Sequence, residues 1–350
     1  MQGAECKVRG AAVLLLTAMV LAPAVHGQPA RAHRIIFDTD FALPPQDDGL
    51  ALAFALNSPE LDIVGITTVA GNYNLARANA DVLRMLEISG RTNIRVHAGA
   101  RRPLAHDVDE YARTHYGSWW SDAPAPAPPG GFAKIAVQAE SAADFIARTV
   151  TASPGEIEIL AIGPLTNIAT AIRQQPAAAR AIKRITIMGG AIASLPDGGG
   201  NATPNAEFNF WVDPEAARAV LRSGVPIVLS PLNVSRKTAF DKAAFDRIAA
   251  AKTPIAQLVA AQMGPRYVRD ATYRPHMYDE VAAASVVDSS IVKTKPMIVD
   301  VDDHHGIDYG TSIDADAPWP GAEGASRVQV QYDIDNARFM TLFVDRIVRQ

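Results

Sequence analysis

The sequence predicts an open α/β fold, in which a mainly parallel sheet carries helices on both faces. Short runs rich in β-branched residues alternate with longer segments of helical periodicity along most of the 350 residues. Strand and helix patterns alternate instead of gathering in separate blocks, which favours parallel pairing through helical crossovers. Polar loops follow several predicted strands, and ligands of such sheets bind beyond the carboxyl ends of the strands.

Each predicted strand is a short apolar run that ends at a polar or glycine-containing loop. The first contains Ile35, Ile36 and Phe37, directly before an aspartate. The predicted strands cover residues 34–37, 63–69, 94–97, 157–161, 184–188, 226–229 and 297–301. The helical patterns between and after them cover residues 47–57, 75–89, 165–175, 214–223, 278–287 and 336–348.

Residues 1–27 are predicted to be a secretory signal peptide. Lys7 and Arg9 precede an apolar segment, 11–24, which is too short to span a bilayer and ends in small residues up to Gly27. A retained anchor helix is the alternative, and the small-residue ending disfavours it. We therefore expect a single exported domain, 28–350, periplasmic or extracellular. The only cysteine, Cys6, lies in the segment that is removed, so the mature chain has no disulfide.

Composition excludes two classes of partner. The formal net charge is −4 and no run of Lys and Arg occurs, which gives nucleic-acid binding little support. No later segment is apolar enough to span a membrane. The proline-rich stretch 122–131 is short and predicts an extended loop, not a domain linker.

Four acids crowd the loop after the first predicted strand, in FDTDFALPPQDD, at Asp38, Asp40, Asp47 and Asp48. Like charges at that density need a positive partner. A hard divalent cation with oxygen ligands, calcium above all, would supply it. The competing interpretation is structural: Asp38 would bond loop amides, and the other acids would cap the helix that follows.

More distant residues could complete the coordination shell. Asp279 could add a carboxylate, and the turn around Ile162 and Gly163 could add a backbone carbonyl. No Cys or His cluster has zinc-like spacing, which disfavours a softer metal. A cation ringed by acids, with amides and a glutamate nearby, suits the hydroxyls of a sugar or nucleoside.

The motifs DTD…DD, VAGN, AIGPLTNIA, NATPNAEFNFWVDPEAA and YDEVAA resemble those of the inosine–uridine-type nucleoside hydrolases, from about residue 34 to 287. The resemblance implies an open α/β fold and a calcium-dependent N-ribohydrolase that cleaves ribose from base with water. It implies a metal site of Asp40, Asp48, Asp279 and the carbonyl of Ile162, in which Asp40 is also the general base. The residues implied to bind ribose hydroxyls are Asp47, Asn72, Asn201, Glu207 and Asn209, with Asp38 as a support behind the metal ligands.

The chain departs from the family pattern at two places. The stretch FALPPQ makes the loop between Asp40 and Asp47 three residues longer than the usual DxDPGxDD, with Pro44 and Pro45 to stiffen it. Tyr278 also stands where many relatives have a catalytic histidine before the last metal ligand. An unperturbed tyrosine has a pKa near 10 and is a poor acid at neutral pH.

His276, two positions earlier, either replaces that acid or is an ordinary surface or capping histidine. Trp119 and Trp120, on the loop after the third predicted strand, either stack on a purine or pack against their own scaffold. VDVDDHHG, 299–306, is either a second metal site or a solvated turn, and we expect the turn.

Several functions fit these residues to different degrees. The first is an exported hydrolase of ribonucleosides, leaning toward purines. The alternative is a nucleoside- or ribose-binding protein on the same fold, weakened in catalysis by the longer loop and the tyrosine. A different ribosyl substrate for the same chemistry is a third, and a haloacid-dehalogenase-like phosphatase, suggested by FDTDFA, leaves NATPNAEFN unexplained. The resemblance implies a homodimer or a homotetramer without choosing between them.

Overall fold

The centre of the fold is one twisted sheet, in a computed structural model that describes residues 1–5, 32–106, 110–116 and 120–349. Nine strands are found among these residues, in the order β3-β2-β1-β4-β5-β6-β9-β7-β8. Their bounds are β1 His33–Thr39, β2 Leu61–Thr68, β3 Val96–Ala98, β4 Ile157–Ala161, β5 Arg184–Met188, β6 Ile227–Ser230, β7 Val292–Val301, β8 Ser312–Ala315 and β9 Arg327–Ile334.

In this spatial order, β3, β2, β1, β4, β5, β6 and β9 all pair in parallel with their neighbours. The last two strands differ, because β7 runs antiparallel to both β9 and β8. The strand order reverses direction between β1 and β4, which makes this pair the topological switch point, where sheets of this type bind ligands. Asp40 follows β1 and Ile162 follows β4, so both emerge at the switch point. The prediction of an open, mainly parallel α/β sheet is confirmed.

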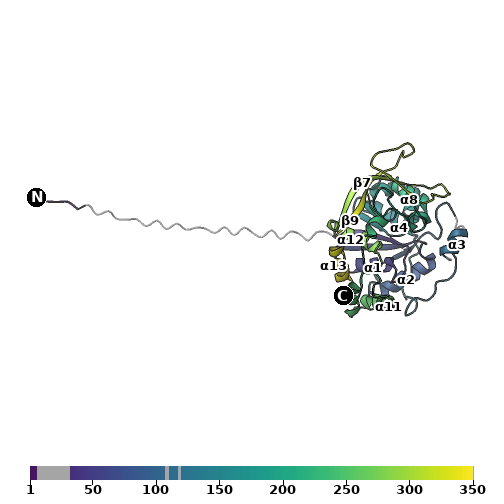
Figure 1. Ribbon diagram of the computed structural model, residues 1–350, viewed down its shortest axis with the longest axis horizontal. Helices are drawn as coiled ribbons and strands as arrows, with labels where there is room; N and C mark the ends of the chain where they lie inside the picture. The colour runs from purple at the N-terminus through teal and green to yellow at the C-terminus, as the bar shows by residue number, and fades with distance from the viewer. Residues whose placement is uncertain (6–31, 107–109, 117–119, 350) are drawn as a thin grey trace. The chain divides into compact units, whose positions relative to one another are not determined.

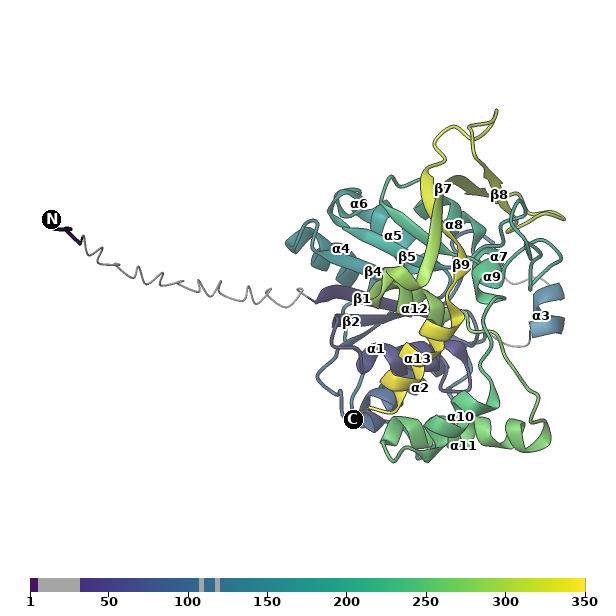
Figure 2. The same cartoon turned by 60° about the vertical axis from the view of Figure 1, so that its left-hand side comes forward.

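Helices cover both faces of the sheet (Figures 1 and 2). One apolar core includes residues of α1, α2, α10, α11, α12 and α13, and the other includes residues of α4, α5, α6 and α8. The longer helices are α1 Asp47–Leu56, α2 Leu75–Ile88, α4 Ala142–Ala152, α5 Thr166–Gln174, α8 Pro214–Leu221, α10 Lys242–Ala250, α11 Pro254–Arg269, α12 Asp279–Val287 and α13 Asn336–Ile347. The shorter ones are α3 Glu110–Tyr116, α6 Ala177–Ala181, α7 Phe208–Val212, α9 Leu232–Ser235 and the 3₁₀ turn η1 Ser289–Ile291.

Several elements lie outside the sequence predictions. Strands β8 and β9 were not predicted, β7 begins five residues before the predicted 297, and α4, α10 and α11 are additional helices. The missed β9 is only partly buried, although it pairs with β6 on one side and β7 on the other. The prediction that 122–131 is a loop is confirmed, since no helix or strand covers it.

The residues from Ala32 to Gln350 form one compact unit. The predicted signal peptide falls largely on residues 6–31, which lie outside the described part of the chain. Within the described part, no helix is both long enough and apolar enough to cross a membrane.

Candidate active site at the switch point

Three carboxylates from the first turns of two packed helices meet at the carboxyl edge of the sheet. Asp47 and Asp48 begin α1, and Asp279 begins α12. Each offers an oxygen within 4.8 Å of an oxygen of the other two. The positive end of a helix dipole favours acids in a first turn, but it neutralises only part of three charges. The arrangement could therefore hold a metal ion.

Asn72 joins Asp40 to this cluster. Its backbone N–H donates to Asp40 Oδ2 at 2.6 Å, and its side-chain Nδ2 donates to Asp48 Oδ2 at 2.8 Å. Asp40 is fully buried, and its Oδ1 has no hydrogen-bond partner among the described residues. The other oxygen is thus fixed by Asn72 while Oδ1 remains free to take a ligand or a proton.

Two glycines allow Asp40 to lie where it does. An ideal Cβ at Gly71 would lie 2.2 Å from Asp40 Oδ2, and one at Gly163 would lie 2.7 Å from the backbone nitrogen of Asp40. Both distances are well below any normal contact. The glycines in VAGN and IGPLTN therefore leave the space that Asp40 occupies.

A further layer of polar groups holds the acids from behind. Thr39 donates its hydroxyl to Asp48 Oδ1. Asp38 Oδ2 accepts from Thr67 Oγ1 at 2.5 Å and from Asn167 Nδ2 at 2.9 Å. Asp38 is therefore buried and held by side chains of β2 and α5.

Burial dominates the electrostatics of the cluster. It raises the pKa of Asp38 to about 6 and, together with the neighbouring Asp47, the pKa of Asp40 to about 7. Burial and the surrounding acids raise the pKa values of Asp48 and Asp279 well above their usual range. No basic side chain among the described residues pairs with these acids. Buried, mutually repelling oxygens with an unpartnered Oδ1 fit a hard divalent cation.

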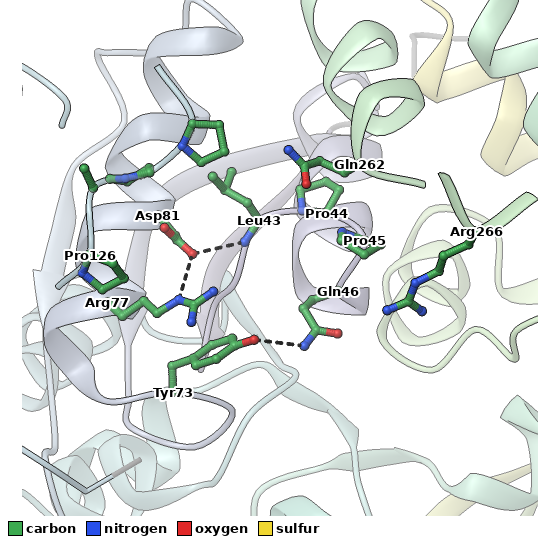
Figure 3. Close-up of a pocket in the computed structure, with 13 residues that line it drawn as sticks. Leu43, Pro44, Pro45, Gln46, Tyr73, Arg77, Asp81, Pro126, Gln262 and Arg266 are labelled. Atoms are coloured by element: carbon green, nitrogen blue, oxygen red, sulfur yellow. Dashed lines mark hydrogen bonds and ion pairs between the residues drawn. The ribbon is translucent and has the colours of Figure 1, made fainter. Parts of the chain in front are cut away.

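The longer loop packs against α2 and leaves the acids together. Leu43 N donates to Asp81 Oδ2 at 3.4 Å, and Gln46 Nε2 lies 3.5 Å from the hydroxyl of Tyr73. Figure 3 shows Leu43 to Gln46 on one wall of a cavity of about 240 Å³, with Tyr73, Arg77 and Asp81 opposite. The extra residues therefore bulge toward α2, and Asp47 still meets Asp48 and Asp279.

Three of the predicted ribose-binding residues lie on or before α7. Glu207 caps this helix, accepting from the backbone nitrogens of Asn209 at 2.8 Å, Gly190 at 2.9 Å and Phe210 at 3.1 Å. Burial raises its pKa to about 7. Asn209 Nδ2 lies 3.2 Å from the carbonyl of Ile162, which places it beside the turn after β4. Asn201 is exposed and its Oδ1 accepts from Phe208 N at 2.8 Å.

Tyr278 and His276 lie side by side next to the acids, with ring centroids 6.4 Å apart. Burial and Asp47 raise the pKa of Tyr278 further above its usual value, so it is a poor proton donor here. His276 is exposed, and its Nδ1 lies 2.9 Å from the carbonyl of Thr238, which orients the ring and leaves Nε2 outside that bond. Both residues line a cavity that also reaches Asp47.

The aromatic loop is only partly described. Trp119 lies outside the described residues, as do two of its neighbours. Trp120 is 8% exposed and packs in a small apolar cluster with Ala70, Leu75 and Val212. Its ring is therefore covered by its own scaffold in this conformation.

The acidic stretch 302–304 lies in the connection between β7 and β8, where a solvated turn was expected. Asp302, Asp303 and His304 offer ligand atoms within 4.8 Å of one another. However, Asp302 Oδ1 accepts from the backbone of His304 at 3.0 Å, and Asp303 pairs with Arg218. A turn with a nearby arginine accounts for these contacts.

Sequence reasoning missed three residues of the site. Thr39 lies inside the DTD motif and Asn167 inside GPLTN, so their motifs were seen but not their contacts. Glu280 directly follows Asp279, is 1% exposed, and has an Oε2 without a hydrogen-bond partner among the described residues. A second acid after Tyr278, in the motif YDEVAA, was the only signal for it.

The comparisons with known proteins match this geometry. The family model described as inosine-uridine preferring nucleoside hydrolase matches residues 35–341. A buried acid cluster at the switch point of an open α/β sheet thus belongs, in this chain, to an N-glycosyl hydrolase. The chain is a member of the nucleoside hydrolase family.

The chain is similar to relatives whose named specificities differ. It is 40% identical, over 65% of its length and 68% of the relative's, to a pyrimidine-specific ribonucleoside hydrolase RihA of Citrobacter koseri. It is 33% identical, over 86% and 93%, to a pyrimidine-specific ribonucleoside hydrolase RihB of Escherichia coli. Among solved structures, a purine-preferring ribonucleoside hydrolase from Gardnerella vaginalis superposes with a TM-score of 0.76 at 27% identity, covering 90% of this chain and 98% of its own.

Proposed function

We propose that this protein is an exported, calcium-dependent hydrolase that cleaves the N-glycosidic bond of ribonucleosides, with a lean toward purines. One observation carries the proposal: Asp40, Asp48 and Asp279 are buried together without a basic partner among the described residues. These acids, with the carbonyl of Ile162, would hold the ion. Calcium is the hard cation that accepts such a set of carboxylate and carbonyl oxygens.

When bound, the cation would orient two vicinal hydroxyls and make a nearby water more acidic. Asp40 would accept the proton of the attacking water. Its unpartnered Oδ1, with Oδ2 held by Asn72 N, supports this role. Asp47, Asn72, Asn201, Glu207 and Asn209 would bind the ribose hydroxyls. The fixed oxygens of Glu207 keep further lone pairs for such a hydroxyl.

The same residues favour the transition state over the ground state. Cleavage of a glycosidic bond passes through an oxocarbenium-like state, in which positive charge grows on the sugar. A ring of buried carboxylates stabilises that charge, and its groups need no reorganisation as the charge develops. Charge stabilisation and positioning are therefore the main contributions of this chain.

The proposed preference for purines and the proposed export rest on other features of the chain. The purine lean rests on Tyr278 beside the acids and on Trp119 in the aromatic loop, while Trp120 is covered. Export rests on Lys7, Arg9 and the apolar segment 11–24. Amino-terminal sequencing of the protein secreted by a bacterial host tests the cleavage after Gly27, and light scattering tests the proposed dimer or tetramer.

The central test measures ribose release from a panel of purine and pyrimidine ribonucleosides, with calcium and with a chelator. Calcium-dependent release that is lost in Asp40→Ala, and kept in the exposed control Asp316→Ala, is expected. A protein that still binds calcium and ribosides but releases no ribose from any nucleoside would overturn the hydrolase in favour of a binding protein.

A further inference from the structure

A cavity of about 160 Å³ adjoins the acid cluster on the side of Asp47. Asp47 lines it, and the same carboxylate meets those of Asp48 and Asp279. One end of the cavity is therefore the site proposed to hold ribose and cation. The walls beyond that end are largely aromatic and apolar, with Tyr278 and Phe240 among them.

Gln46, Arg266, His276 and Glu280 are polar residues that line this cavity and that the mechanism does not use, and Glu280 is the buried acid among them. It belongs to the first turn of α12, is 1% exposed, and lines the cavity together with Asp47. Its Oε2 has no hydrogen-bond partner among the described residues. A buried carboxylate oxygen without a partner is costly, so it points to a hydrogen-bond donor that the ligand brings.

Glu280 lines the cavity with Asp47, whereas Asp40, Asp48 and Asp279 do not line it. The three acids whose oxygens come close enough to share an ion are Asp47, Asp48 and Asp279, without Glu280. A carboxylate in that position is poorly placed to share the ion with Asp40 and Asp48. It is well placed beside whatever extends from the ribose past Asp47.

We propose that Glu280 determines specificity for the leaving base, by accepting N–H groups from the edge of guanine. Guanine presents two adjacent donors, the ring N1–H and the 2-amino group, and a carboxylate accepts such a pair in a bidentate manner. Aromatic walls suit a planar heterocycle. The inference rests on the proposed function, since it names the substrate of that site.

The experiment compares guanosine with purine riboside, which has the same ring system but no N–H at that edge. Values of kcat/KM are measured for the wild type, for Glu280→Gln and for the exposed control Glu323→Gln. The amide introduced by Glu280→Gln sets its own N–H groups against the donors of guanine, so the guanosine preference should fall at least about tenfold, as for a site that loses a built hydrogen bond. p-Nitrophenyl riboside, whose leaving group carries no such donor, should be cleaved within about threefold of the wild-type rate, as should all substrates by the control variant.

A binding measurement separates this inference from the proposed function. Calorimetry with free guanine and free purine needs no turnover, and the wild type should bind guanine more tightly, with the difference lost in Glu280→Gln. If the wild type prefers guanine and Glu280→Gln does not, while no nucleoside is hydrolysed, the proposed hydrolase function is refuted and the role of Glu280 in binding the base is supported. Equal losses on guanosine, purine riboside and p-nitrophenyl riboside would show a structural or metal-holding role instead. A wild type without preference for guanine over purine would overturn the inference without any variant.

Discussion

Replacing Gly71 with alanine should disable catalysis through a single steric contact. The added Cβ would lie 2.2 Å from Asp40 Oδ2, against about 3.4 Å for an ordinary contact, so the carboxylate must move by 3.4 − 2.2 = 1.2 Å. A displacement of about 1 Å of a catalytic group costs on the order of 100-fold in rate. That loss corresponds to about 2.7 kcal/mol of transition-state stabilisation.

The assay is kcat/KM for ribose release in saturating calcium, with the thermal midpoint measured in parallel. Gly306→Ala is the matched control, because its Cβ would meet only the carbonyl oxygen of His304 at 3.8 Å, and it should keep wild-type activity. A Gly71→Ala variant that folds and retains activity within about threefold of the wild type would refute the placement of Asp40 as the proton acceptor, since it would tolerate a shift of about 1 Å.

Three further predictions concern other parts of the fold. Burial would raise the pKa of Glu158, but Lys183, His33 and Arg184 lower it to about 2, so its folded pKa lies below the unfolded value. The ionised carboxylate therefore contributes up to about 3 kcal/mol of stability above pH 4.5, which is lost as the pH falls toward 2. Denaturation of the wild type and of Glu158→Gln should show a smaller difference in stability at about pH 3 than at about pH 7. Trp120→Ala should cost about 3 kcal/mol of stability and leave the KM for purine nucleosides nearly unchanged, because the ring is packed in the scaffold; a raised KM at unchanged stability would instead support stacking. A chelator should lower the thermal midpoint and calcium should restore it, because calcium at about 100-fold excess over Kd raises the free energy of unfolding by about 2.7 kcal/mol. Asp48→Asn should abolish this response. A wild-type midpoint that does not change with calcium would contradict the metal site.

The strands around the switch point were predictable because they are buried on both faces. β1, β4 and β5 are therefore short, nearly continuous apolar runs that end at polar loops, and this pattern is visible in one dimension. β9 was missed although RVQVQYDI alternates apolar and polar residues, which is the local pattern of a half-buried strand. Only its pairing with β6 and β7 depends on segments far apart in the chain.

The sequence by itself determined which side chains could form the site. Asp40, Asp48 and Asn72 follow predicted strands or begin the next helix, and the motifs around them suffice to indicate a cation and a ribosyl substrate. The location of the site could be predicted because the loops after parallel strands all lie at one edge of the sheet.

Only the tertiary structure decided how those side chains meet. The packing of α1 against α12 brings Asp47 and Asp48 to Asp279, despite the longer loop. It also buries Glu280, whose Oε2 has no partner among the described residues, while other contacts cover Trp120. Burial and pairing depend on segments far apart in the chain, so the energies that follow from them arise only when the chain has folded.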